Sequence, residues 1–139
     1  MEKMNFNFER DPESGVILVG IFLDGQYRLK MLLDTGASHT TIDSNELYMA
    51  DYDLSNTLGT MELETANGII QAEIFEIQEV AALGISRKNF SIQIYDFLKH
   101  GIISKYQGLL GMDFFEGTKF CIDTLSNQIT IEELNSPPI

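Results

Sequence analysis

The sequence predicts an all-β fold, a small closed or partly open β-barrel with one or two short helices. Two dipeptides, Asp24-Gly25 and Asn67-Gly68, stand between strand-like stretches and are typical of two-residue hairpin turns. Residues 26–33 alternate between polar and apolar side chains, which is the periodicity of a strand with one buried face. Short strands joined by glycine and asparagine turns, with little helical pattern, therefore indicate a single β domain.

The ends of the chain are predicted to lie outside that domain. With 139 residues the chain has the size of one domain and can bury a core. Residues 5–9 alternate polar and aromatic side chains, as a short strand or an arm does, within an N-terminal arm over residues 1–15. The domain itself is expected to span residues 16–134. Residues 135–139 form a tail whose prolines cannot donate to a strand ladder.

The first predicted hairpin leads directly to the most unusual stretch of the chain. An apolar run at residues 16–23 precedes the Asp-Gly turn, and residues 26–33 form the return strand. Because the alternation fixes which side chains are buried, the return strand delivers Asp34 at a defined place beyond its end.

Further elements follow in order. Residues 40–42 are strand formers, and Ser44 is expected to cap a short helix over residues 44–49. Residues 60–65 and 69–80 form a second hairpin around the Asn-Gly turn. Beyond it the predicted elements are strands at 83–85 and 90–95 with a polar turn at 86–89, a loop or helical turn at 98–105, a helical turn at 112–117, and a last hairpin of residues 120–123 and 128–132.

The stretch after the first hairpin, Asp34-Thr35-Gly36-Ala37-Ser38, carries the chemistry. A carboxylate at the end of an apolar strand loses part of its water, which disfavours its charged form. Gly36 permits a sharp turn and a close backbone approach, and the Thr35 hydroxyl can donate and accept. By itself, Asp-Thr-Gly fits an ordinary Asx-type turn after a strand as well as it fits a site.

A second segment favours the site. Leu33-Asp34-Thr35-Gly36-Ala37-Ser38, followed by Gly108-Leu109-Leu110-Gly111-Met112-Asp113-Phe114, resembles the retropepsin-like aspartic proteases over about residues 16–131. The resemblance implies a barrel of the retropepsin type with a flap hairpin that closes over substrate. It also implies a hydrolase that needs no cofactor and no metal.

The resemblance assigns roles residue by residue. It implies that the catalytic loop is Asp34, Thr35 and Gly36, that substrate is bound by Ala37, Ser38, Thr65, Ala66, Asn67 and Gly68, and that Leu109, Leu110 and Gly111 support the catalytic loop. The substrate would be a protein or peptide held as an extended strand.

One count decides the assembly that this chemistry requires. The chain has a single Asp-Thr-Gly, and its nearest echo, Asp123-Thr124-Leu125, has leucine where the glycine must be. An aspartic protease needs two carboxylates, so the second Asp34 must come from a second copy, and we expect a homodimer. Residues 5–9 or the last hairpin are the alternatives for its interface. A non-catalytic dimeric domain that binds peptides or acts as a scaffold is the alternative function.

Composition narrows the partners and the location. A net charge of −12 argues against nucleic acid and against an anionic membrane, because both would be repelled. The chain starts without the apolar core of a signal peptide and has no stretch of membrane-spanning length, so a cytoplasmic location is expected. Cys121, the one cysteine, is expected to be a small buried hydrophobe.

Neither of the two histidines is expected to be a metal ligand or a catalytic residue. His39 and His100 are far apart in sequence and lack neighbouring acid or cysteine clusters, which argues against a transition-metal site. Ser38 and His39 beside Asp34 have the residue types of a hydrolase triad. Adjacent residues of an extended chain point apart, however, so we expect no hydrogen-bonded relay between them.

Overall fold

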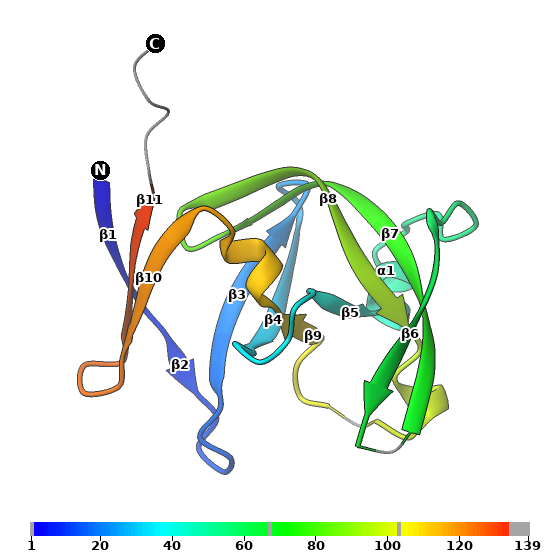
Figure 1. Ribbon diagram of the computed structural model, residues 1–139, viewed down its shortest axis with the longest axis horizontal. Helices are drawn as coiled ribbons and strands as arrows, with labels where there is room; N and C mark the ends of the chain where they lie inside the picture. Colours follow the sequence, from blue (N-terminus) through cyan, green and yellow to red (C-terminus); the bar gives the residue numbers. More distant parts are fainter. Residues whose placement is uncertain (1, 67, 103, 134–139) are drawn as a thin grey trace.

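The computed structural model describes residues 2–66, 68–102 and 104–133, and it confirms the all-β fold (Figure 1). The strands are β1 (Glu2–Asn7), β2 (Glu9–Arg10), β3 (Ile17–Leu23), β4 (Tyr27–Leu33), β5 (Thr41–Asp43), β6 (Gly59–Thr65), β7 (Gly68–Ala82), β8 (Ile85–Tyr95), β9 (Gly108–Leu110), β10 (Thr118–Asp123) and β11 (Gln128–Glu133). The helices are α1 (Ser44–Met49) and the 3-10 turns η1 (Leu98–His100) and η2 (Met112–Phe115).

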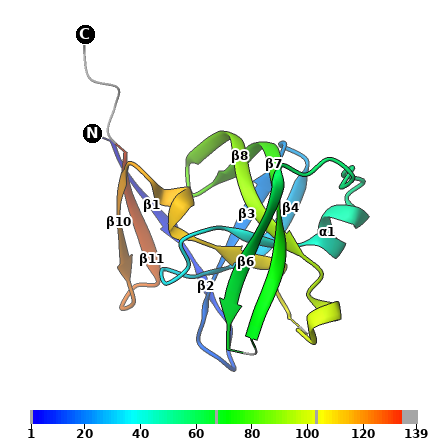
Figure 2. The same ribbon diagram turned by 45° about the vertical axis from the view of Figure 1, so that its right-hand side comes forward.

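Most of the strands belong to one closed barrel. The larger sheet has the order β2-β3-β4-β9-β5-β8-β7-β6. A further pairing of β3 with β7 closes six of these strands into a ring, in the order β3, β4, β9, β5, β8 and β7. Phe22 opposite Ala81 and Leu23 opposite Val80 make that closure. The remaining strands form a three-stranded sheet, β1-β11-β10, beside the barrel in both views (Figures 1 and 2).

The core follows the alternation seen in the sequence. In β4, Leu29, Met31 and Leu33 are buried while Arg28 and Lys30 are exposed, so the predicted register is confirmed. The largest fully buried side chains of the barrel come from several strands and include Ile21, Leu23, Met31, Ile42, Ile77, Ile92 and Ile94. Burial of these branched and long apolar side chains is the main force that closes the barrel.

Two parallel pairings at the centre of the barrel position the loops that matter. β4 runs parallel to β9, with Leu33 opposite Leu110, and β5 runs parallel to β8. Adjacent parallel strands end at the same edge of a sheet. The residues after Leu33 and after Leu110 therefore leave the barrel side by side, although they are far apart in the sequence.

The strand boundaries contain one clear error of prediction. Of the strand predicted at 83–85, only Ile85 lies in a strand; it begins β8, which continues without a break through the predicted strand at 90–95, so the polar turn predicted at 86–89 is wrong. The chain reverses instead at Leu83 and Gly84, which both have positive φ angles, 51° and 72°. The polar residues lie on an exposed part of the strand, where Ser86 and Lys88 both bind the carboxylate of Glu79 on β7.

Helix α1 has the predicted bounds but a different cap. Its N-cap is Asp43, not Ser44, and the Asp43 carboxylate accepts a hydrogen bond of 3.2 Å from the Asn45 amide. Asp43 is also the last residue of β5, so its extended backbone already has the conformation that an N-cap requires. The helix therefore begins without an intervening loop.

The three-stranded sheet includes the N-terminal segment and contradicts the expectation for the cysteine. β1 and β10 both pair with β11, with Phe6 opposite Ile129 and Phe120 opposite Ile131. Along β10, Phe120 and Ile122 pack against the core, so the residue between them faces outward. Cys121 is exposed and not buried, because the strand period of two decides its face.

None of the helices in the described ranges has the length and apolarity needed to cross a bilayer.

A hydrogen-bonded tyrosine ties the first hairpin turn to the rest of the barrel. The Tyr52 hydroxyl donates to Asp24 Oδ2 over 2.6 Å, and the Glu79 amide donates to Asp24 Oδ1 over 2.9 Å. Burial, and then the neighbouring Asp24 carboxylate, raise the pKa of Tyr52, so the hydroxyl keeps its proton and remains a donor. The Tyr52 ring also lies 5.7 Å from the Tyr27 ring and 6.1 Å from the Phe75 ring.

Replacing Tyr52 with phenylalanine should lower the free energy of unfolding by about 1–2 kcal/mol, because Asp24 loses a donor in a partly buried place. Urea unfolding followed by fluorescence or circular dichroism measures this. Tyr48→Phe is the matched control, since Tyr48 is 75% exposed and should change stability by less than about 0.5 kcal/mol. Equal effects of the two changes would contradict the role given to the hydroxyl.

Candidate active site

The acid loop, residues 34–40, begins as a tight turn at the end of β4. The Asp34 amide donates to the Leu110 carbonyl over 3.0 Å, which fixes the start of the loop to β9. Asp34 Oδ1 accepts a hydrogen bond of 3.0 Å from the Gly36 amide, and the Ala37 amide donates to the Asp34 carbonyl over 3.1 Å. Asp34 is half-buried, whereas Thr35 and Gly36 are exposed, so in one chain the loop faces solvent.

The segment after β9 packs directly behind this loop. A methyl group on Gly111 would lie 2.6 Å from the carbonyl carbon and 2.7 Å from the carbonyl oxygen of His39. The Met112 amide donates to the Ala37 carbonyl over 2.8 Å, and the Asp113 carboxylate accepts from both the amide and the hydroxyl of Thr40. Glycine is required at 111 because the two backbones touch.

A cleft of about 460 Å³ lies in front of the acid loop. It brings together several residues that the sequence predicted for the site, and its walls are Asp34, Gly36, Ala37, Ser38, His39, Thr41, Met61, Glu62, Leu63, Glu64, Thr65, Gln93, Tyr95 and Leu109. Thr35, Ala66 and Gly68 do not line it, and Leu110 and Gly111 lie behind the loop. Asn67 lies outside the described residues.

The wall opposite the acid loop is β6, one strand of the predicted flap hairpin. Met61, Leu63 and Thr65 are less exposed than Glu62 and Glu64, as expected for an edge strand with one face toward the barrel. The Thr65 hydroxyl donates to the Gly68 carbonyl over 2.9 Å and braces the end of the hairpin.

Buried Gln93 fixes this wall to the barrel, and sequence reasoning missed it. Its amide nitrogen lies 2.7 Å from Met61 Sδ, and its carbonyl accepts from the Thr41 hydroxyl over 3.3 Å. Gln93 is only 4% exposed. A polar residue between two isoleucines suggests a solvent-facing position, and only the covering strand β6 reveals that this face is buried.

Ser38 and His39 contradict the expectation that they point apart. Ser38 Oγ lies 2.8 Å from His39 Nδ1, because the chain bends here and is not extended. Within the described ranges, however, no hydrogen bond or ion pair joins His39 to a carboxylate. The pair therefore lacks the third member of a Ser-His-Asp relay.

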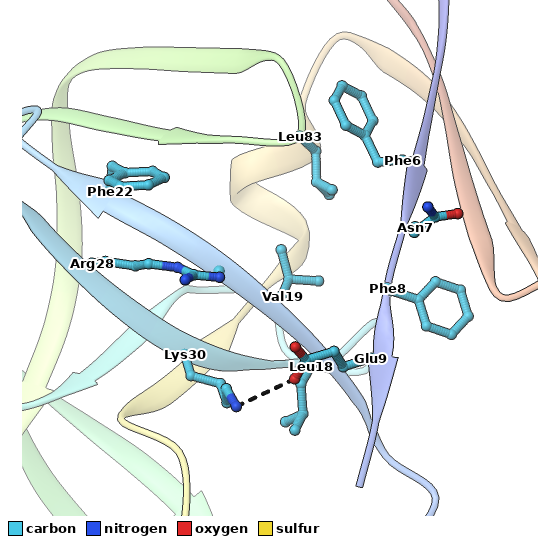
Figure 3. A pocket seen from close by; sticks show the side chains of 11 residues that line it. Phe6, Asn7, Phe8, Glu9, Leu18, Val19, Phe22, Arg28, Lys30 and Leu83 are labelled. Atoms are coloured by element: carbon cyan, nitrogen blue, oxygen red, sulfur yellow. Dashed lines mark ion pairs between the residues drawn. The ribbon is translucent and has the colours of Figure 1, made fainter.

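Two further features bear on what the site can bind. Among the described residues, no group of three or more His, Cys, Asp or Glu side chains could hold a metal ion. A separate pocket of about 270 Å³ lies between the first two strands and the β3–β4 hairpin, and Lys30 and Glu9 form an ion pair of 3.3 Å there. Figure 3 shows the side chains that line it. No residue of the acid loop lines that pocket, so the cleft at Asp34 is the candidate active site.

Comparisons with known proteins show the family and the class of fold. The family model described as aspartyl protease matches residues 19–114, a range that includes the acid loop and Gly111. The chain therefore belongs to the aspartyl protease family. Its structure is also similar to the crystal structure of a retropepsin-like aspartic protease from Rickettsia conorii, with a TM-score of 0.65 and 22% identity over 95% of this chain and 92% of that one. The fold is thus retropepsin-like. A comparison with curated protein sequences gave no match.

Replacing Gly111 with alanine should lower the free energy of unfolding by about 3 kcal/mol, because the added methyl group overlaps backbone atoms that cannot move. Gly20→Ala is the matched control. A methyl group there would meet the Arg28 side chain at 3.1 Å, and that flexible side chain can move away. Denaturant unfolding of both variants measures the difference, and similar losses would contradict the close backbone packing behind the acid loop.

Proposed function

We propose that this protein is an aspartic endopeptidase that works as a homodimer, with one Asp34 from each subunit at a shared centre. The observation that carries the proposal is the single Asp34-Thr35-Gly36 loop, which faces solvent at the edge of a cleft in a chain of the aspartyl protease family. One chain supplies one such acid, and the chemistry requires two.

Two adjacent carboxylates divide the work of peptide hydrolysis. Two unit charges about 3 Å apart repel by about 5 kcal/mol at an effective dielectric constant near 20, so the pair holds one proton between them. The ionised carboxylate takes a proton from water as the water oxygen bonds to the peptide carbonyl carbon, and the protonated one donates to the carbonyl oxygen. The tetrahedral intermediate then breaks its carbon–nitrogen bond as a proton passes to the leaving amine.

The cleft suits a substrate in the form of an extended strand. Ala37 and Ser38 line it beside Asp34, and β6 forms its opposite wall. In the proposed complex, the hairpin from Thr65 to Gly68 closes over the peptide, and alternate peptide side chains enter pockets on each side. The Thr35 hydroxyl is exposed in the single chain. In the dimer it would form a hydrogen bond across the two-fold axis to the partner loop and keep the two Asp34 carboxylates coplanar.

Asp34→Asn should abolish cleavage of an unfolded protein substrate while leaving the fold intact, because an amide cannot act as the base. Hydrolysis is measured across acidic to neutral pH, with and without pepstatin, a hydroxyl peptide that mimics the transition state. The matched control is Asp51→Asn at the exposed turn after α1, outside the cleft, which should keep full activity. Absence of cleavage by a proven wild-type dimer at every pH would instead identify a non-catalytic peptide-binding domain.

Specific activity should also fall when the enzyme is diluted, because a dimer held by mass action dissociates into chains with one acid each. The initial rate is measured over a wide range of enzyme concentrations and compared with the mass from sedimentation or light scattering at each concentration. The expected rate varies with the square of concentration where the monomer dominates. A strictly first-order dependence from a proven monomer would refute the shared pair of acids.

A further inference from the structure

We propose that Thr40 and Asp113 form a polar clamp that positions the Asp34 carboxylate for catalysis, an inference that rests on the proposed function. The Thr40–Asp113 clamp is the set of hydrogen bonds that joins the end of the acid loop to Gly111 and the first turn of η2. Neither residue is expected to touch substrate, so both are positioning residues and not catalytic ones.

The clamp is dense in hydrogen bonds. The Thr40 amide lies 3.0 Å from each carboxylate oxygen of Asp113, and the Thr40 hydroxyl donates to Asp113 Oδ1 over 2.7 Å. The same hydroxyl accepts from the Gly111 amide over 3.1 Å. Thr40 is fully buried, and Asp113 is half-buried. The threonine hydroxyl therefore links two backbone segments that water cannot easily reach.

The clamp completes the attachment of the acid loop to the barrel. The loop is held at its start by the bond from the Asp34 amide to Leu110, and at its middle by the bond from Met112 to the Ala37 carbonyl. Its end is held by a backbone bond of 2.9 Å from the Gln93 amide to the Thr40 carbonyl, and by the bonds from Thr40 to a residue 73 positions further along the chain. Because the other attachments involve backbone atoms only, Thr40 and Asp113 are the side chains that tie the end of the loop to Gly111 and η2.

A displaced loop would act on the rate and not on binding. The Asp34 carboxylate must meet a water molecule and the partner's acid within a fraction of an ångström, and a shift of about 1 Å can cost about a hundredfold in rate. Peptide binding along the rest of the cleft does not need that accuracy. A clamp that only stabilised the fold would change the melting temperature without this selective effect on kcat.

Thr40→Val tests the clamp, and Thr40→Ser is its matched control. Valine keeps the shape of threonine but leaves the Gly111 amide without an acceptor, whereas serine keeps the hydroxyl. With the full-length dimer well below its melting temperature, Thr40→Val should lower kcat by about a hundredfold with KM within about twofold. Thr40→Ser should stay within about threefold of wild type. A normal kcat in Thr40→Val, or a loss confined to KM, would overturn the proposal.

If the Thr40→Val protein does not fold, a variant at Asp113 tests the clamp in its place. Asp113→Ala removes both oxygens that accept from the Thr40 N–H and hydroxyl, and Asp113→Asn, which keeps one oxygen within reach of both donors, is its matched control. In Asp113→Ala, kcat should fall by about tenfold or more with KM unchanged, and Asp113→Asn should lose less. An unchanged kcat in a folded Asp113→Ala dimer would equally overturn the clamp.

Amide hydrogen exchange separates this inference from the proposed function, because it needs no turnover. Exchange at Gly36 and Ala37, measured by NMR on the full chain, should rise at least about tenfold in Thr40→Val and stay near wild type in Thr40→Ser. If the wild-type protein cleaves nothing, the proposed protease function is refuted, but the exchange measurement still tests the Thr40–Asp113 clamp. Unchanged exchange at both amides in folded Thr40→Val would overturn the clamp whatever the activity.

Discussion

The parallel pairing of β4 with β9 is the constraint on which the candidate site depends. Leu33 and Leu110 are opposite each other in the barrel, so Asp34 and Gly111 leave the sheet at the same edge. The hydrogen bond from the Asp34 amide to the Leu110 carbonyl extends the ladder by one step into the acid loop. The position of the candidate catalytic acid is therefore set by the rigid part of the fold, and the loop only completes it.

Close backbone contact explains why the two motifs belong together. Gly111 touches His39 and Ala37, and no side chain would fit between the segments. The Asp-Thr-Gly loop needs a backbone without a side chain behind it, and the later motif provides that backbone together with the Asp113 carboxylate. Placing the acid loop at the open edge of the cleft leaves Thr35 and Gly36 exposed in the single chain, which suits the proposed meeting of two copies.

Local patterns predicted most of the fold. The β3–β4 and β6–β7 hairpins, the alternating strands β4 and β6, and the bounds of α1 depend on neighbours in the chain and were correctly predicted, although the first hairpin loop has three residues and not two, because Leu23 pairs with Tyr27. The polar stretch inside β8, the exposed face of Cys121 and the burial of Gln93 were not. The strand period places Cys121 on the face opposite its two neighbours, but which face of a strand is buried depends on what packs against it, as β6 does against Gln93, and that is a long-range property of the sheet.

The sequence by itself determined the class of fold, the register that delivers Asp34, and the presence of only one Asp-Thr-Gly in the chain, because turn chemistry, strand period and residue count are local properties. Only the tertiary structure decided which side chains meet at the cleft: Gln93 under β6, Ser38 against His39, and Thr40 bound to Asp113. These contacts arise because barrel closure joins segments far apart along the chain, and no short-range pattern encodes which of them will touch.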